Sequence, residues 1–367
     1  MTHYVVDGPE DAPVVVMASS LGTTHAMWDG QAAVLAGEFR VVRVDHPGHG
    51  GSPPPSGPIT VDALAEGVLA LLDRLGVERF AFVGLSLGGA VAMATALRAP
   101  ERIDRLALCC TAMRFGDPDP WLERAATVRD RGVEAVAPGV LERWLTPAAP
   151  PAMRERLETM LLSSDPEGYA RCCEAIAGHD VRGRLRELRV PVLAIAGSDD
   201  PATPPEWLEA IAGEAPGARL HVIEGARHIA NVEFAAELDR VLFPFLRGSS
   251  GLRVRREVLG DAHVDASIER TSAFTADFQD LITRYAWGEI WTRPGLDRRM
   301  RSAITLTALV AGGHEKELAM HTRAALRNGL TPDEIKEVLL QTAIYCGVPA
   351  ANSAFAVAQR VIDEEAK

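Results

Sequence analysis

The chain has 367 residues, of which 47% are hydrophobic and 24% charged, a composition typical of globular enzymes. A single hydrophobic core rarely serves so long a chain, so we expect two domains. The formal net charge of -12 argues against nucleic acid or an anionic membrane as the main partner and leaves small molecules as the expected ligands.

The five cysteines are two adjacent pairs, Cys109-Cys110 and Cys172-Cys173, and the isolated Cys346. Neighbouring cysteines rarely bond each other, and neither a C-x-x-C nor a Cys/His zinc spacing is present. The apolar run Val14–Ala18 is too short for a signal sequence, and nothing approaches the roughly 20 apolar residues of a membrane span. The sequence therefore predicts free thiols and a cytoplasmic protein.

Residues 1–247 alternate short β-branched runs with amphipathic stretches. The segment Val61–Leu75 has helical periodicity, with Thr60 as a plausible N-cap and Gly76 as a stop signal. Strands that alternate with helices predict an α/β domain with a mostly parallel sheet covered on both faces. The expected strands are Val14–Ala18, Val41–Asp45, Phe80–Val83, Leu106–Cys109, Val192–Ala196 and Leu220–Ile223.

The alternation stops between about residues 115 and 188, where the sequence is helical, rich in Arg and Glu, and free of strand-like runs. The sheet pattern resumes at Val190. We expect a helical lid inserted into the sheet domain.

Gly248-Ser249-Ser250-Gly251 has the composition of a flexible linker, which we place at residues 248–254. From 255 to 367 no strand signal remains, so a separate all-α domain is expected. One helix start is especially clear, because Thr331-Pro332-Asp333-Glu334 supplies an N-cap, a proline at the first helical position and a capping-box glutamate.

Gly84-Leu85-Ser86-Leu87-Gly88 follows an expected strand and precedes an expected helix. The G-x-S-x-G pattern is a weak motif alone, but the strand–turn–helix context is the one that a nucleophile elbow requires. There the glycines relieve steric conflict with the neighbouring backbone, and Ser86 stands at a helix N-terminus whose N–H groups favour a developing anion. The alternative is an ordinary turn serine.

A serine hydroxyl needs a general base to act as a nucleophile. His228 follows the last expected strand, and Asp199 and Asp200 follow the preceding one. The chain order Ser, Asp, His is that of α/β hydrolases. His228 is therefore the candidate base and one of the two aspartates its orienting acid.

The sheet, lid, elbow and the loop Asp45–Ser52 resemble the α/β-hydrolase superfamily. More narrowly, Ser19–Thr24 with Met27-Trp28-Asp29, and then Gly197–Pro204, resemble 3-oxoadipate enol-lactonases. The resemblance implies that Asp200 is the triad acid and that the N–H groups of Leu21 and Leu87 form the oxyanion hole. Within the lid, Trp144 either lines the substrate pocket or belongs to the lid core. His46 and His49 are expected to be loop residues.

Residues 255–367 resemble 4-carboxymuconolactone decarboxylases over close to a full domain length. The resemblance rests on several segments in one order, namely Tyr285–Trp291, Arg293–Asp297, Arg301–Leu306, Glu317–His321, Ala324–Gly329 and Tyr345–Ala351. The wider superfamily includes proteins with a C-x-x-C-x-x-x-H redox motif. Aligning His321 with that histidine places Glu317 and His314 at the cysteine positions, so acid–base groups replace the thiols.

His314, Glu317 and His321 fall within a narrow arc of a helix, so they converge if that face lines a pocket; the alternative is a solvated face. The spacing is not H-E-x-x-H, and we expect no metal. No cofactor is expected either, because loss of CO2 from 4-carboxymuconolactone leaves electrons that the conjugated lactone carbonyl accepts as a dienolate. Arg293, Arg298, Arg299 and Arg301 are available for the substrate carboxylates, and His321 for proton donation.

The two resemblances together imply one bifunctional enzyme of aromatic catabolism, in which the helical domain makes the enol-lactone that the first domain opens. A generic serine esterase or perhydrolase with a non-catalytic helical oligomerisation tail is the alternative. A hydrolase fused to a thiol redox carrier is disfavoured by the missing C-x-x-C. The resemblance to the decarboxylases also implies a homo-oligomer assembled through the helical domain.

Overall fold

The computed structural model describes residues 2–272 and 274–366. Its contacts divide the chain into two compact units, residues 1–249 and 250–367, which are described separately below. Among the described residues, no helix is both long and apolar enough to cross a lipid bilayer.

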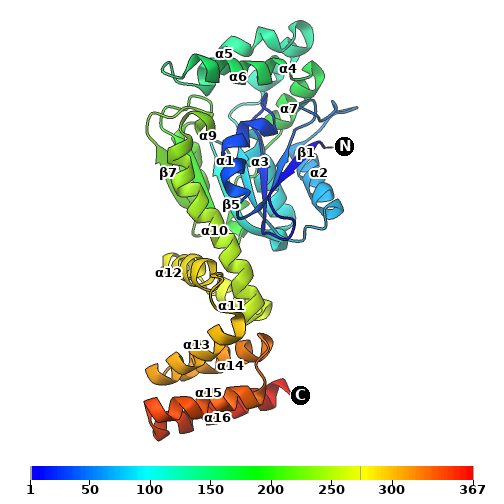
Figure 1. Ribbon diagram of the computed structural model, residues 1–367. Helices are drawn as coiled ribbons and strands as arrows, with labels where there is room; N and C mark the ends of the chain where they lie inside the picture. Colours follow the sequence, from blue (N-terminus) through cyan, green and yellow to red (C-terminus); the bar gives the residue numbers. More distant parts are fainter. Residues whose placement is uncertain (1, 273, 367) are drawn as a thin grey trace. The chain divides into compact units, whose positions relative to one another are not determined.

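The N-terminal unit is built on a seven-stranded sheet in the order β1-β3-β2-β4-β5-β6-β7 (Figure 1). Only the edge strand β1 is antiparallel to its neighbour, and every other pair is parallel. The strands are β1 (Tyr4–Asp7), β2 (Val14–Ala18), β3 (Arg40–Val44), β4 (Phe80–Leu85), β5 (Ile103–Cys109), β6 (Val192–Gly197) and β7 (Arg219–Ile223).

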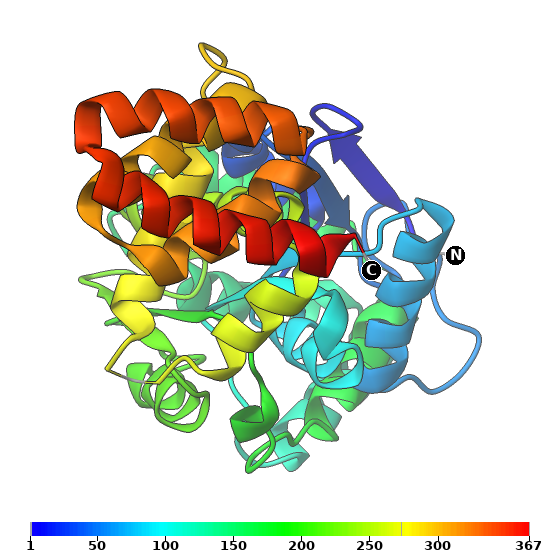
Figure 2. The same cartoon turned by 90° about the horizontal axis from the view of Figure 1, so that it is seen from below.

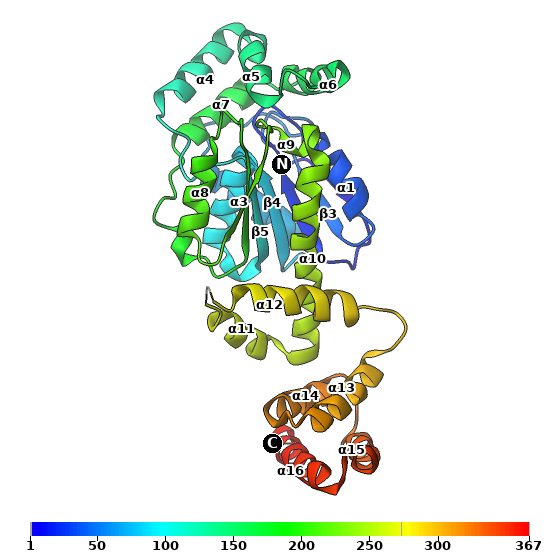
Figure 3. The same cartoon turned by 90° about the vertical axis from the view of Figure 1, so that its left-hand side faces the viewer.

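Helices cover both faces of this sheet, as Figure 3 shows: α1 and the first part of α10 on one face, α3 and α8 on the other. The central strand β4 is consequently a continuous apolar run that is buried at every position. The expected N-cap is confirmed, since Thr60 Oγ1 accepts the N–H of Ala63 at 3.1 Å. These helices are α1 (Asp29–Leu35), α2 (Val61–Arg74), α3 (Leu87–Arg98), α8 (Pro205–Glu214), α9 (Ala230–Glu233) and α10 (Ala235–Leu259).

Four helices gather at one end of the unit and form the helical insertion that was expected as a lid between β5 and β6 (Figure 1). They are α4 (Asp119–Arg131), α5 (Ala137–Trp144), α6 (Pro151–Leu162) and α7 (Pro166–Ala177). Backbone hydrogen bonds tie the end of α5 to the loop after β7: the N–H of Ile229 donates to Trp144 O at 3.1 Å. Short 3-10 turns complete the unit at His25–Trp28, Pro100–Arg102, Val133–Ala135 and Leu185–Glu187.

The prediction of a flexible linker at residues 248–254 is wrong, because this segment lies inside helix α10. Buried apolar residues continue the helix through this segment, with Leu246 before it, Leu252 and Val254 within it and Val258 after it. Gly251 is needed for packing rather than flexibility, since a Cβ there would lie 2.0 Å from the carbonyl oxygen of Thr283. Composition alone predicted a linker; tertiary contacts favour the helix.

Among the residues described, the regular secondary structure of the C-terminal unit consists of helices. Helices α13 to α16 pack on one another around an apolar core that includes Leu306, Leu339 and Ala358 (Figure 2). The predicted capping box is confirmed at the start of α15, where Thr331 and Glu334 satisfy each other's backbone N–H groups. The helices are α11 (Asp261–Glu269), α12 (Ala276–Ile282), the π-helix η5 (Thr283–Ile290), α13 (Arg298–Gly312), α14 (Glu315–Arg327), α15 (Pro332–Cys346) and α16 (Val348–Glu365).

Candidate active sites

Ser86 occupies a strained turn between β4 and α3. Its φ of 59° lies in the left-handed region, which non-glycine residues rarely adopt. The turn is as tight as the motif predicts: a Cβ on Gly84 would lie 2.2 Å from Gly88 O, and one on Gly88 would lie 2.2 Å from Ala18 O. Only glycine fits at either position, and Ser86 lines the cavity described below.

His228 and Asp200 lie together in the loops that follow β7 and β6. The Nδ1–H of His228 donates to Asp200 Oδ2 at 2.8 Å, which leaves Nε2 available to a serine hydroxyl. Asp200 also accepts hydrogen bonds from the N–H of Ala202 at 2.8 Å and the hydroxyl of Thr203 at 2.5 Å. Burial alone would raise the pKa of Asp200, but His228 and these donors hold it below its usual value, so the carboxylate is ionised at neutral pH.

This geometry distinguishes between the two candidate acids, Asp199 and Asp200. Asp199 is exposed and accepts a hydrogen bond from the hydroxyl of its neighbour Ser198 at 2.8 Å. Asp200 is 3% exposed and is the aspartate that contacts the histidine. The structure thus brings Asp200, rather than Asp199, to His228.

Leu21 and Leu87 both lie near Ser86 in the chain's fold, and their oxyanion-hole role stays a prediction. Leu87 is the first residue of α3, so its N–H has no carbonyl acceptor one turn back, and Leu21 lines the same pocket as Ser86. The loop that carries Leu21 is fixed from below by a buried histidine. His49 Nε2 accepts the N–H of Gly22 at 3.0 Å, while its Nδ1 lies 3.0 Å from the carbonyl of Pro47.

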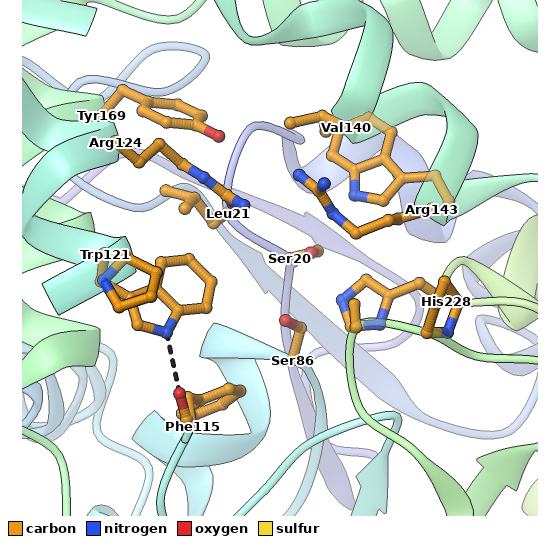
Figure 4. Close-up of a pocket in the computed structure, with 14 residues that line it drawn as sticks. Ser20, Leu21, Ser86, Phe115, Trp121, Arg124, Val140, Arg143, Tyr169 and His228 are labelled. Atoms are coloured by element: carbon orange, nitrogen blue, oxygen red, sulfur yellow. Dashed lines mark hydrogen bonds between the residues drawn. The ribbon is translucent and has the colours of Figure 1, made fainter. Parts of the chain in front are cut away.

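A cavity of about 220 Å³ lies above Ser86 between the sheet and the lid (Figure 4). Ser86 and His228 form its floor, and the lid helices supply most of its walls. Trp144 lines this cavity and is 4% exposed, so it is at once a pocket residue and part of the packed lid. Trp121 lies across the cavity, where its indole N–H donates to Phe115 O at 2.9 Å.

Two lid arginines that the sequence analysis did not single out reach into this cavity. Figure 4 shows the guanidinium groups of Arg124 and Arg143 directed toward each other above Ser86. Burial, and then repulsion from Arg124, lower the pKa of Arg143. The Arg124 guanidinium also lies 4.7 Å from the ring centroid of Trp121. Two cations over an acyl-transfer centre favour an ester or lactone that also carries a carboxylate.

One group of potential metal ligands lies elsewhere in the N-terminal unit. His3, His25 and Asp45 offer ligand atoms within 4.8 Å of one another. The Asp45 carboxylate is already engaged by the N–H groups of His25 at 2.6 Å and Gly51 at 3.1 Å, so it fixes the turn after β3. The rings of His3 and His25 also contact the Asp45 carboxylate, at 2.7 and 3.1 Å, so hydrogen bonds hold this group together.

In the C-terminal unit, His321 lies on α14 against the π-helix. Its ring is nearly parallel to that of Trp287, with centroids 6.4 Å apart. Burial, followed by repulsion from His263, lowers the pKa of His321 to about 4, while Glu317 acts in the opposite direction. In the unliganded protein at neutral pH this imidazole is therefore neutral, which makes it a hydrogen-bond donor or a base rather than the ready proton donor we expected.

Of the other two candidate residues, only Glu317 shares a helical face with His321. Glu317 lies in the first turn of α14 and is exposed, at the spacing from His321 that places them on one face. His314 is the N-cap residue with φ -90° and ψ 71°, so it precedes the helix and the expected periodicity does not apply to it. Gly313, with φ of 69°, breaks the chain direction immediately before it.

The expected arginines of this unit contact other groups of the unit, and only Arg301 among them is half-buried. Arg298 pairs with Glu257, and Arg301 donates to the carbonyl oxygen of Arg293 at 2.6 Å. Arg299 pairs with Glu334, beside the capping box. None of these contacts involves His321.

Comparison with known proteins divides the chain in the same way. The alpha/beta hydrolase fold family matches residues 13–150 and 152–235, and the carboxymuconolactone decarboxylase family matches residues 276–360. A 3-oxoadipate enol-lactonase of Acinetobacter baylyi is 37% identical over 234 residues, which cover 63% of this chain and 87% of the relative. A 4-carboxymuconolactone decarboxylase of the same organism is 49% identical over 118 residues, which cover 32% of this chain and 88% of the relative.

Among solved structures, the enol-lactonase from Burkholderia xenovorans LB400 superposes on the N-terminal unit. It is 40% identical with a TM-score of 0.65, and the match covers 67% of this chain and 96% of that structure.

Proposed function

Because this chain belongs to the α/β-hydrolase family over residues 13–235 and to the carboxymuconolactone decarboxylase family over residues 276–360, we propose that it catalyses two consecutive reactions. The C-terminal unit decarboxylates 4-carboxymuconolactone to 3-oxoadipate enol-lactone, and the N-terminal unit hydrolyses that product to 3-oxoadipate. The observation that carries the proposal is that one chain matches relatives named for both reactions, and that it covers more than four fifths of the length of each.

The hydrolytic step uses the Ser86 constellation. Ser86 Oγ attacks the lactone carbonyl while His228 Nε2 takes its proton, and Asp200 keeps the imidazole oriented and stabilises its positive charge. The N–H groups of Leu21 and Leu87 receive the oxyanion. Ring opening expels an enolate that becomes a ketone, so this step is effectively irreversible. Water activated by His228 then releases 3-oxoadipate from the acyl-enzyme.

The lid arginines support an acidic substrate for this step. The enol-lactone carries one carboxylate, and Arg124 and Arg143 are the cations that face the cavity above Ser86. Placing the carboxylate between them relieves their mutual repulsion and orients the ring over the serine.

The decarboxylation needs no external electron sink. The bond between the ring carbon and its carboxylate breaks, CO2 leaves, and the electron pair moves through the ring to the lactone carbonyl as a dienolate. A proton then returns to a ring carbon, and His321, which is neutral, is the candidate to relay that proton from water. Because the two reactions are tethered, the labile enol-lactone meets its hydrolase at a raised effective concentration.

We further propose a homo-oligomer in the cytoplasm, assembled through the C-terminal unit. Large apolar side chains there are strongly exposed, including Tyr345 at 80%, Ile344 at 79% and Val348 at 73%. The five free cysteines suit a reducing compartment. Sedimentation analysis tests the assembly: Ile344→Asp should yield a smaller species, and an unchanged sedimentation coefficient would contradict this interface.

Supplying the two substrates separately tests the assignment of each reaction to its unit. With 3-oxoadipate enol-lactone, wild type should form 3-oxoadipate and Ser86→Ala should not exceed the spontaneous rate. With 4-carboxymuconolactone, Ser86→Ala should release CO2 and form enol-lactone as wild type does, whereas His321→Ala should form enol-lactone more slowly because the dienolate lacks its proton relay. A wild-type protein that opens the lactone but releases no CO2 would instead favour an esterase with a non-catalytic helical tail.

A further inference from the structure

Arg255 is a buried cation in the C-terminal unit without an anionic partner. It lies on α10 and is 6% exposed. Its Nη1 donates to Gln279 Oε1 at 3.1 Å and to Thr283 Oγ1 at 3.2 Å, and its Nη2 donates to Ser267 Oγ at 3.0 Å. All three acceptors are neutral. In the part of the chain that the structure describes, no carboxylate pairs with Arg255, and its Nε–H is buried without an acceptor.

A buried guanidinium in this state is energetically unfavourable, because its lost hydration is only partly replaced. Burial, and then the neighbouring charge of Arg256, lower the pKa of Arg255 accordingly. Arg256 shows the usual solution, since it pairs with Asp261 at 3.0 Å and Asp265 at 2.6 Å. Arg255 lacks such a partner, and an anionic ligand would supply it.

Further cationic or polar groups lie on or beside α11, the helix that Arg255 contacts through Ser267. His263 and Ser267 are four residues apart in α11, so they share one side of the helix, and Gly260 is the N-cap residue immediately before it. Ser267 is the acceptor of Arg255. Gly260 leaves room for Arg327, because a Cβ there would lie 2.8 Å from both terminal nitrogens of that guanidinium. Arg327 thus lies against the residue before α11 and Arg255 contacts Ser267 further along it, so His263 lies between these two contacts along the chain.

This face is also close to His321. Burial and the charges of Arg255, Arg270 and Arg327 lower the pKa of His263, and His263 in turn lowers that of His321. Val264, next to His263, packs in one small core with Trp287, the ring stacked on His321. The helices α10, α11 and α14 thus place arginines and two imidazoles around one location.

We propose that Arg255, with Arg327 and His263, forms the carboxylate-binding site of the decarboxylase unit, and that it holds the carboxylate that the lactone retains. The proposal rests on the decarboxylase function given above. Pairing the leaving carboxylate with a buried cation would stabilise the ground state and oppose loss of CO2, so Arg255 suits the other one. The leaving carboxylate then lies toward His321, through which a proton from water reaches the ring carbon after CO2 departs.

The test replaces Arg255 in the full-length protein and follows decarboxylation alone. Arg255→Met should raise the KM for CO2 release from 4-carboxymuconolactone by about 30-fold or more, as expected for removing one partner of a buried charge pair. Arg255→Lys keeps the charge and should recover part of the affinity. Arg253→Met is the matched control, because Arg253 is exposed on the same helix and pairs with Glu257; its KM should match wild type.

A binding measurement separates this site from the reaction. Homocitrate γ-lactone has the same two carboxylates on a saturated ring that cannot form the dienolate. Its binding is measured by calorimetry in an Arg143→Met background, because that substitution weakens binding at the N-terminal cavity. Arg255→Met should abolish binding without lowering the unfolding temperature, since the substitution removes an uncompensated charge. Binding and KM within twofold of wild type would overturn the proposal, as would an equal loss in Arg253→Met. Arg255-dependent binding with no CO2 from wild type would retain the site and refute the decarboxylase function.

Discussion

The lid arginines allow a sharp prediction for the hydrolase unit, because they act on one part of the substrate only. Arg143→Met removes a charged donor that faces the cavity and leaves the Asp200–His228 pair in place. A hydrogen bond to a charged group contributes about 1.5–3 kcal/mol. The kcat/KM for 3-oxoadipate enol-lactone should therefore fall roughly 10- to 150-fold. A neutral ester such as phenyl acetate has no carboxylate to lose and should be hydrolysed within about twofold of the wild-type rate.

Both substrates are assayed on the same preparations, by loss of lactone absorbance and by phenol release. Arg131→Met, at an exposed position of the lid helix α4, controls for the change of side chain. Stability should not fall in Arg143→Met, since burial and Arg124 already disfavour the charge. Equal losses on the acidic and the neutral substrate would refute the reasoning, because they would indicate damage to the triad rather than loss of a carboxylate contact.

Three further predictions concern the triad, a buried histidine and a helix cap. Asp200→Asn should lower kcat for the enol-lactone by about 10⁴-fold by misorienting the imidazole, whereas Asp199→Asn should stay near wild type; similar losses in both would contradict the geometry. Burial, then repulsion from His46, lowers the pKa of His49 to about 4, so the unfolded chain binds this proton first as pH falls. The His49 contribution to the free energy of unfolding is thus fully present above about pH 6.5 and should decrease by about 3 kcal/mol toward pH 4. In His49→Gln the free energy of unfolding by urea should depend less on pH, and an identical pH dependence in both proteins would exclude His49 as the cause. Thr331→Ala should destabilise the C-terminal unit by about 1 kcal/mol in thermal unfolding, and no change would show that the capping box is dispensable.

The hydrolase site was largely predictable because its signals are local. The elbow around Ser86 follows from glycine spacing between a strand and a helix, and His228 from its place after the last strand. Asp199 and Asp200 are adjacent, so pattern alone left both open, and the resemblance to enol-lactonases selected the one that contacts His228. The edge strand β1 was missed because its four residues carry too little periodicity.

The lid and the C-terminal unit depended on tertiary contacts that the sequence does not display. The lid is visibly rich in arginine, but only packing decides that Arg124 and Arg143 face the cavity. Likewise Arg255 follows a segment that we expected to be a linker, and nothing local distinguishes it from its exposed neighbour Arg253. The prediction that His314 shares a helical face with Glu317 and His321 was wrong because the helix begins one residue after His314.

The central claim is that two sites in one chain act in series. Its most direct test incubates 4-carboxymuconolactone with wild type and with Ser86→Ala while CO2, enol-lactone and 3-oxoadipate are followed together. Wild type should yield CO2 and 3-oxoadipate in equal amounts, and Ser86→Ala should release CO2 at the wild-type rate while enol-lactone accumulates and decays only spontaneously. Loss of CO2 release in Ser86→Ala, or its absence in wild type, would contradict the account.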